Sequence, residues 1–202
     1  MWIIWPCAGV CRPYSVCPRQ QCTLTLSGRA VGVAQCDNKL FVVTLDSDTI
    51  QIFERDNKQQ TNITVNGLKE PTDIVACTET KQLYIADCES DCVWGVSLDG
   101  QHVDKLTNRS TSPKDWRPYS LSLTSRRLLA TSKLVNNSLF KHRVLLLNSR
   151  LELERVLLDI EHHQLVKSPW RLCYVEQTSQ LIVASELMSS PVIQVYRIRE
   201  SS

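Results

Sequence analysis

Short apolar runs separated by polar turns dominate the middle of the chain. Between Pro71 and Gly100 three such runs follow one another, Ile74–Cys77, Leu83–Ala86 and Val93–Val96. Each run is too short for a helix and rich in β-branched or aromatic residues, a pattern typical of strands buried on both faces. The connections span only a few residues, as in an antiparallel meander. The pattern therefore predicts an all-β chain of short antiparallel strands.

The same pattern recurs at a nearly fixed interval. Leu40–Val43 matches Leu83–Ala86 at an offset of 43 residues, and the match continues without a gap as far as Asp56 and Asp99. A period in the forties with about four strands in each unit is the signature of a β-propeller blade. One four-stranded sheet cannot keep both of its apolar faces dry, so each unit needs neighbours.

Four units fit the chain, and the third is the least regular. An insertion at about Ser132–His142 separates its second and third strands, and Leu151–Leu158 permits either an outer strand or a helical turn. Pro71, Pro118 and Pro169 stand before the innermost strands, where no ladder N–H is needed. The predicted blades cover approximately residues 31–68, 69–112, 113–165 and 166–202 of a propeller region spanning residues 22–202.

The last unit has three predicted strands, and an extra strand is predicted at Cys22–Ser27, where threonine or serine alternates with leucine. That strand could complete the last blade and remove an exposed sheet edge. Two arrangements stay open: a small ring closed in this way, or an arc of the type found in six-bladed rings. Residues 1–21 are predicted to be a poorly ordered, cysteine-rich leader.

The second unit carries a recognisable motif: Leu83–Asp87 (LYIAD), Val93–Val96 and the turn Asp99–Gly100. These residues resemble the NHL and related six-bladed β-propeller repeats. The resemblance implies a propeller fold for about residues 31–198. It does not select one activity, because members of that class bind RNA, bind proteins or act as enzymes.

Composition narrows the function classes further. The chain has 202 residues, is 43% hydrophobic and 22% charged, and carries a net charge of +2, so no strong field points to nucleic acid. No apolar run approaches the roughly 18 residues that span a bilayer, and no signal peptide is evident. Nine cysteines cannot all pair within one chain. These features favour a cytoplasmic location and predict no membrane span.

Candidate ligand-binding residues lie where the third and fourth units begin, at Trp116, Arg117, Trp170 and Arg171. The two arginines would suit an anionic ligand if they lay near the axis; alternatively they pair with acids such as Asp73 or with backbone carbonyls. The tryptophans would stack on a base or anchor a peptide, unless they pack between blades.

Two cysteines raise the question of a disulfide. Cys88 and Cys92 bracket a short turn and could form a disulfide in an oxidising compartment, whereas in the cytosol they would stay reduced. The sequence predicts no catalytic residue, metal ligand or cofactor site, since it contains no nucleophile elbow, phosphate loop or zinc-protease motif.

The sequence therefore predicts a non-enzymatic binding module. A protein or peptide partner would dock on the blade-connecting loops, at Trp116–Arg117, Trp170–Arg171 and the Val135–His142 insertion. The first alternative is single-stranded RNA binding, which requires a basic face lined with aromatic residues. The second is a metal-dependent hydrolase or lyase, which requires several acids or histidines at the axis.

Overall fold

The computed structural model describes residues 24–54, 60–107, 116–125, 127–136, 139–159, 169–187 and 190–198. These residues form fifteen strands, gathered in four antiparallel sheets, and one 3-10 turn, η1 (Glu176–Thr178). The predicted leader, residues 1–21, lies outside them. A search of the described part of the chain for a helix able to cross a bilayer finds none.

Each sheet is one blade, in which consecutive strands are neighbours in space. Blade 1 contains β1 (Ala30–Cys36), β2 (Lys39–Thr44), β3 (Thr49–Glu54) and β4 (Gln60–Thr64). Blade 2 contains β5 (Pro71–Cys77), β6 (Gln82–Asp87), β7 (Cys92–Ser97) and β8 (Val103–Thr107). Blade 3 contains β9 (Trp116–Leu123), β10 (Leu128–Asn136), β11 (Leu139–Leu147) and β12 (Leu153–Asp159). Blade 4 contains β13 (Pro169–Val175), β14 (Gln180–Leu187) and β15 (Ser190–Arg197).

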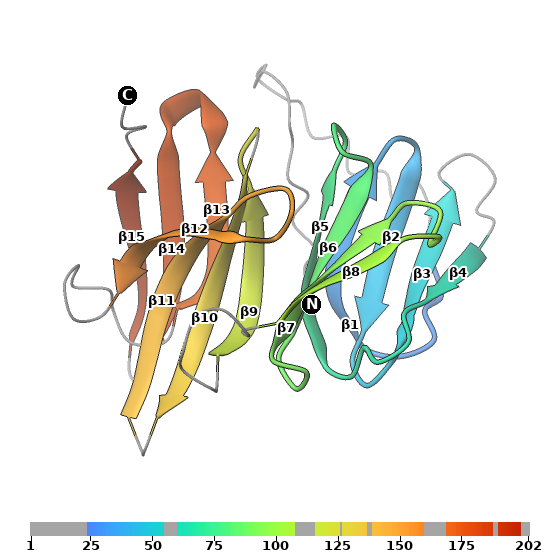
Figure 1. The fold of residues 1–202 in the computed structure, drawn as a ribbon, viewed down its shortest axis with the longest axis horizontal. Helices are drawn as coiled ribbons and strands as arrows, with labels where there is room; N and C mark the ends of the chain where they lie inside the picture. Colours follow the sequence, from blue (N-terminus) through green and yellow to red (C-terminus); the bar gives the residue numbers. More distant parts are fainter. Residues whose placement is uncertain are drawn as a thin grey trace.

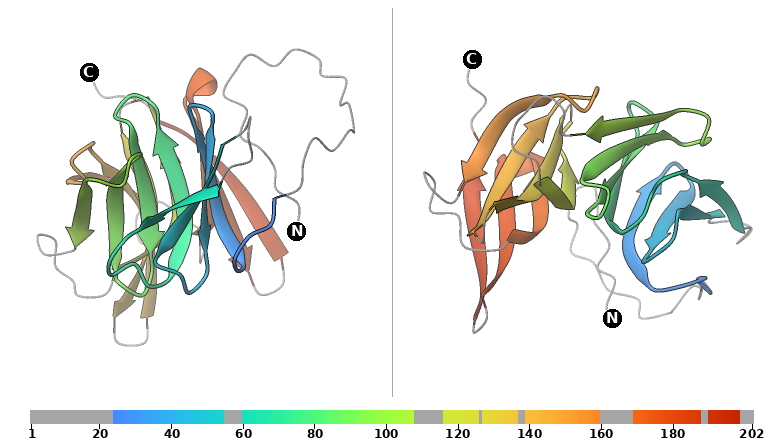
Figure 2. Two further views of the ribbon diagram at one scale, coloured as in Figure 1. Left: turned by 90° about the vertical axis from the view of Figure 1, so that its right-hand side faces the viewer. Right: turned by 60° about the horizontal axis from the view of Figure 1, so that its bottom comes forward.

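The blades are arranged radially, as predicted for a β-propeller. The first strand of each blade is innermost: β1 packs on β5, β5 on β9 and β9 on β13. Blades 1 and 2 lie on the right in Figure 1 and blades 3 and 4 on the left, and Figure 2 shows the four sheets spread about a common axis. The fold is therefore a four-bladed β-propeller.

Three apolar cores lie between neighbouring blades and hold the fold together. The middle strands β2, β6 and β10 supply the most deeply buried side chains, among them Phe41, Ile85 and Leu129. Because side chains alternate across a strand, β6 and β10 each contribute to two cores, whereas β2 contributes to one. Leu83 and Ile85 pack toward blade 1, whereas Tyr84 packs toward blade 3.

The structure corrects three details of the sequence prediction. Within Cys22–Ser27, the described residues 24–27 form no strand, and the described part of blade 4 keeps three strands. The insertion at Ser132–His142 is mostly not a separate loop, because β10 and β11 extend through it as one long hairpin. The ambiguous segment Leu151–Leu158 forms a strand, β12, that pairs with β11.

Candidate functional site

The innermost strands begin at one end of the propeller, near Pro71, Pro118 and Pro169, and we call this end the proline face. In every blade a register shift interrupts the pairing of the first two strands near this end, directly after Ala30, Pro71, Pro118 or Pro169. A bulge re-aims the side chains beside it. Gly32, Asp73 and Arg171 directly follow this shift, and Ser120 lies within it. Asp73, Ser120 and Arg171 form one axial network.

Asp73 is the centre of this network. One carboxylate oxygen, Oδ2, accepts a hydrogen bond from the Ser120 hydroxyl at 2.8 Å and another from the Leu121 amide at 3.0 Å. The same oxygen lies 3.1 Å from Nη1 of Arg171, while Oδ1 accepts from the Ile74 amide at 3.0 Å. A single carboxylate from blade 2 therefore contacts blades 3 and 4.

Two further contacts complete the circuit. The Ser120 hydroxyl accepts a hydrogen bond from the Leu172 amide at 3.1 Å. Nη2 of Arg171 donates to the carbonyl of Val31, 3.3 Å away, in blade 1. Residues from all four blades are thus linked around the axis, and the Arg171 side chain bridges blade 4 to blades 1 and 2.

The network is more deeply buried at its acid than at its base. The Asp73 side chain is 15% exposed and that of Arg171 is 47% exposed. Burial raises the pKa of Asp73 above its ordinary value, because its effect outweighs that of the Arg171 guanidinium and of the bonds from Leu121, Ser120 and Ile74, which act in the opposite direction. Since four donors use this carboxylate, it is poorly placed to bind a metal or act as a base.

Counting from the prolines shows which predicted residues are equivalent. Arg171 stands two positions after Pro169, and the residue two positions after Pro118 is Ser120, not Arg117. Arg117 instead lies on the rim, where its Nε is 3.6 Å from Oδ1 of Asp91 in the β6–β7 turn. The two arginines therefore pair with different acids. Pairing with acids was the alternative that the sequence analysis gave to a shared site for an anionic ligand.

The two tryptophans also differ in their settings. Trp170 is the extra residue of the β13 bulge, stands directly before Arg171 in the chain and is 56% exposed. The Trp116 backbone pairs with Leu134 at the start of β9, and its side chain lies outside the described part. Only Trp170 therefore has a described setting that suits an anchor residue.

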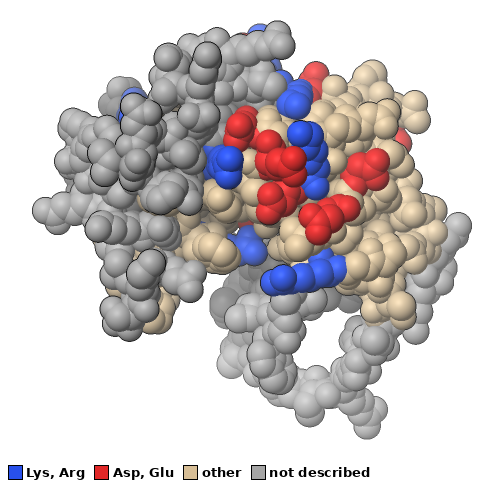
Figure 3. Space-filling model, turned by 90° about the horizontal axis from the view of Figure 1, so that it is seen from below, with Lys and Arg blue, Asp and Glu red and all other residues tan. Residues whose placement is uncertain are grey.

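Charges of both signs share the proline face. Besides the pairs Arg171–Asp73 and Arg117–Asp91, Lys69 lies 3.5 Å from Glu89. Figure 3 looks onto this face and shows basic and acidic side chains side by side near its centre. Among the described residues, this face therefore mixes both signs of charge, unlike the single-sign field that attracts a polyanion.

The disulfide that Cys88 and Cys92 could form is not present in the structure, where both residues are free, buried thiols. Cys92 pairs with Asp87 and packs into the core toward blade 1. Cys88 follows Asp87 directly, so its side chain points to the opposite face of the blade. Burial raises the pKa of each thiol to about 12, so neither thiol is activated for nucleophilic chemistry.

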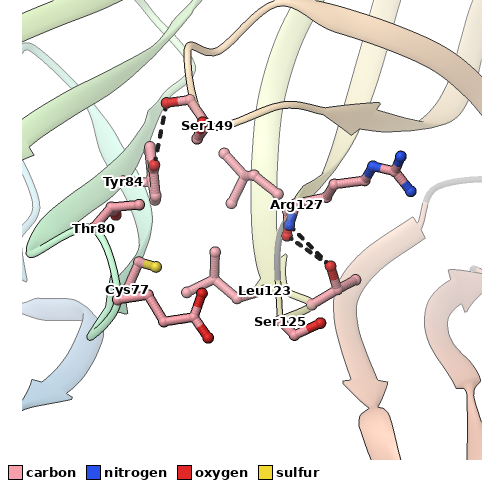
Figure 4. Close-up of a pocket in the computed structure, with 10 residues that line it drawn as sticks. Cys77, Thr80, Tyr84, Leu123, Ser125, Arg127 and Ser149 are labelled. Atoms are coloured by element: carbon pink, nitrogen blue, oxygen red, sulfur yellow. Dashed lines mark hydrogen bonds between the residues drawn. The ribbon is translucent and has the colours of Figure 1, made fainter.

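A cleft lies between blades 2 and 3, at the end of the propeller opposite the proline face. It has a volume of about 250 Å³, with Cys77, Tyr84, Leu123 and Leu128 among its lining residues. Figure 4 shows the Arg127 guanidinium directed away from Tyr84 and Cys77, and its Nε lies 2.7 Å from Glu154. The lining also includes Glu79 and several hydroxyl-bearing residues, so the cleft mixes polar and apolar groups.

Sequence reasoning missed Ser120, which connects Asp73 to blade 4. The sequence did hold a signal: Asp73, Ser120 and Arg171 each stand two residues after Pro71, Pro118 or Pro169. Comparing only arginines and tryptophans between the units does not reveal this shared position. In the described part of the chain, no group of three or more histidine, cysteine, aspartate or glutamate side chains is arranged to hold a metal ion.

Comparisons with known proteins identify the fold alone. No family model matches the chain, and no curated protein matches it. A structure of a nidogen/laminin complex is similar with a TM-score of 0.62 and 16% identity, covering 77% of this chain and 56% of that one. Hydrazine synthase of Kuenenia stuttgartiensis is similar with a TM-score of 0.65 and 11% identity, covering 94% and 49%.

A third similar structure is the Swd1 β-propeller domain of Myceliophteria thermophila, with a TM-score of 0.60 and 10% identity over 85% of this chain and 53% of that one. The chain thus spans about half the length of each of these three structures. At these identities the likeness supports a β-propeller and carries no activity with it.

Proposed function

We propose that this chain is a non-enzymatic β-propeller binding module whose proline face docks a protein or peptide segment. The observation that carries the proposal is the exposed Trp170, held at a β-bulge directly before Arg171 of the axial network. An exposed tryptophan on a rigid scaffold offers a large apolar contact at little cost in conformational entropy, and tryptophan is enriched among the residues that dominate protein interfaces.

The surroundings of Trp170 favour a polypeptide partner. Arg171 and Arg117 each lie beside a carboxylate, so the site presents positive and negative charges together. A peptide that carries both acidic and basic side chains can complement them. Single-stranded RNA, the first alternative, would meet Glu89 and Asp91 on the same face, and like charges oppose binding of phosphates. The similarity to a nidogen/laminin complex is in keeping with a role in protein association.

The enzymatic alternative has less support. A metal-dependent hydrolase or lyase of the propeller class needs free acids or histidines at the axis. The one described axial carboxylate, Asp73, is held by Arg171, Ser120 and two backbone amides. We therefore assign the network a structural role: it holds the inner strands of the four blades, and with them Trp170, in fixed positions. A closer relation to NHL-like repeats is also part of this proposal.

The docking surface extends from Trp170 and Arg171 to the start of β9, at Trp116 and Arg117. The β10–β11 hairpin reaches the same end of the propeller, because the second strand of blade 3 ends there and the third begins there. We include its described end, the Asn136–Leu139 pair within the Val135–His142 segment, at the edge of the proposed surface.

A peptide selection tests this function. Peptides selected from a phage-displayed library on the purified chain are expected to bind Trp170→Ala about 30-fold more weakly, since truncating a central tryptophan costs about 2 kcal/mol. The matched control is Val103→Ala, because Val103 is an exposed apolar residue (44%) on β8. Equal binding to both variants, or tighter binding of a poly-uridine RNA than of any peptide, would contradict the proposal.

A further inference from the structure

The cleft between blades 2 and 3 lies at the end of the propeller opposite the proline face, so a ligand bound there does not depend on the docking proposed above. Its volume of about 250 Å³ is below the roughly 300–1,000 Å³ of pockets that hold a drug-sized ligand. Cys77 of blade 2 and Leu123 of blade 3 lie on opposite sides of it (Figure 4). The cleft therefore has room for one side chain or a small molecule.

Part of the cleft wall is apolar. Leu128 is almost fully buried in the core between blades 2 and 3, and Leu123 packs against that core. The Tyr84 ring lines the cleft from blade 2, and its hydroxyl donates to Oε1 of Gln82 at 2.9 Å. An unbranched hydrocarbon chain can bury its surface against these groups.

The charged groups of the lining are Glu79 and Arg127. Arg127 is already paired, because its Nε lies 2.7 Å from Oε2 of Glu154 and its guanidinium is directed away from Tyr84 and Cys77. The exposed Glu79 carboxylate makes no hydrogen bond or ion pair within the described part of the chain. The charge that the cleft offers to a ligand is therefore negative.

The two neighbouring blade contacts at this end each pair an acid with a donor. Between blades 1 and 2, Nζ of Lys81 donates to Oδ1 of Asp37 at 2.8 Å. Between blades 3 and 4, the Ser125 amide donates to Oε2 of Glu176 at 3.1 Å. Glu79 is the acid at the contact between blades 2 and 3, where the described residues supply no donor to it. An external cation can take that place.

We propose that this cleft binds a primary alkylammonium group, of the kind carried by a lysine side chain or by a free aliphatic amine. The ammonium lies at the Glu79 carboxylate, and the carbon chain packs on Leu123, Leu128 and the Tyr84 ring. The Ser149 carbonyl lies 3.4 Å from the Tyr84 hydroxyl and has a second lone pair for an ammonium N–H. An alkylammonium combines three donors with an apolar stem, so one ligand complements both the acid and the apolar wall.

An NMR titration of the full chain with n-pentylammonium tests the site. A Kd of about 1–10 mM is expected, because so small a ligand cannot bind tightly. The amide signals of Thr80, Ser125 and Ser149 should shift. n-Pentanol, which lacks the charge, should bind about three- to fivefold more weakly, and pentanoate more weakly still, because its carboxylate meets Glu79. Pentanoate binding as tight as that of pentylammonium, or no saturable shift at these amides up to about 50 mM, overturns the proposal.

A blocked lysine, Nα-acetyl-lysine-N-methylamide, distinguishes the two sources of the ligand. Binding equal to or tighter than that of pentylammonium supports the site and assigns it to a lysine of a partner protein. Weaker binding of the blocked lysine, with pentylammonium still bound, supports the site and assigns it to a free amine.

Variants at Glu79 test the role of its charge. Glu79→Gln should weaken pentylammonium binding about three- to fivefold and leave pentanol binding unchanged. Glu79→Lys should weaken it at least about tenfold, because it replaces attraction with repulsion. The matched controls, Glu89→Gln and Glu89→Lys, change an exposed acid on the β6–β7 turn at the proline face and should leave the Kd unchanged. Unchanged binding in both Glu79 variants contradicts the proposal.

Thiol labelling gives a second readout that needs no variant. Cys77 lines the cleft, so its reaction with a maleimide should slow about twofold when pentylammonium is present at its Kd, as followed by peptide mass spectrometry. Cys173, a free and exposed thiol on β13, should react at an unchanged rate. Equal slowing of both thiols, or an unchanged rate at Cys77, contradicts binding in this cleft.

Discussion

Asp87 shows how one buried side chain can join several segments. Its Oδ1 accepts hydrogen bonds from the amides of Glu70 and Ser90, each at 3.1 Å. Its Oδ2 accepts from the Lys69 amide at 3.0 Å and from Nε1 of Trp94 at 3.1 Å. The last residue of the LYIAD motif therefore fixes the link from blade 1 to blade 2, the β6–β7 turn and the largest aromatic side chain of the blade.

The charge of Asp87 is stabilised in the folded state. Burial by itself raises the pKa of this carboxyl, but the hydrogen bonds from Lys69, Glu70 and Ser90 together outweigh burial and lower the pKa below its ordinary value. The unfolded chain therefore binds a proton at a higher pH than the folded chain does. The resulting stabilisation is present above the unfolded pKa, and it is lost as the pH falls through the folded pKa.

Replacing Asp87 with Asn should lower the free energy of unfolding by about 2–4 kcal/mol at pH 7, because an amide can accept on one atom only and leaves buried donors unpaired. Urea unfolding followed by circular dichroism measures the change. The variant should also lose less stability than the wild type between about pH 5 and pH 3. Glu89→Gln, a change at an exposed side chain, is the control and should shift the stability by under about 0.5 kcal/mol. An equal pH dependence for wild type and Asp87→Asn would refute this account.

At the scale of elements, the close approach of inner strands decides how tightly the blades can pack. Gly32 in β1 lies against β5, and a Cβ placed there would come within 2.9 Å of the Ile74 backbone nitrogen and 3.1 Å of side-chain atoms of Ile74 and Val43. The backbone of β5 cannot yield without disturbing Asp73, whose bonds cross the axis. Glycine at this position therefore sets the spacing between blades 1 and 2.

Gly32→Ala should destabilise the chain by about 1–3 kcal/mol through overpacking. Gly95→Ala is the matched control, since the added Cβ would meet the flexible Cδ1 of Leu151 at 3.3 Å, a group that can shift. Thermal unfolding of both variants measures the difference. If Gly95→Ala is as destabilising as Gly32→Ala, the close contact between β1 and β5 does not set the blade spacing.

At the scale of the whole molecule, burial is uneven along the ring. Blades 2 and 3 lie between neighbours and contribute to two cores each, whereas blade 4 contributes to one. In a repeat array each unit draws its stability from its own sheet and from its neighbours. Blade 4 is therefore expected to open before the central blades.

Hydrogen exchange measured by mass spectrometry should show this order. Amides of β14 should exchange at least about tenfold faster than those of β6, because opening blade 4 breaks one interface and opening blade 2 breaks two. Uniform protection across the four blades would indicate a single cooperative unit in place of this gradient.

Much of the architecture was predictable from local pattern. The alternation between Leu83 and Val96, its copy 43 residues earlier and the prolines before the inner strands depend on neighbours in sequence, so periodicity located blades 1, 2 and 4. The extended β10–β11 hairpin was misjudged, because a polar stretch such as Ser132–His142 reads as a loop unless the pairing partner is known.

The site was harder to predict, because its geometry depends on contacts between distant blades. Asp73, Ser120 and Arg171 lie 47 or more residues apart in sequence, and no local pattern states that their side chains meet. The composition of the chain therefore suggested candidate groups, but the partner of each group was decided by which strands the fold brings to the axis.

The sequence alone determined that this protein is a series of short sheets, since strand periodicity and the spacing of the repeat are properties of the chain taken one segment at a time. The tertiary structure alone decided that Arg171 pairs with Asp73, that the thiols of Cys88 and Cys92 are buried and free, and that Ile193 and Val195 of blade 4 are exposed. The physical reason is that hydrogen bonding within a sheet is local, whereas burial and charge pairing depend on what the folded chain places opposite each side chain.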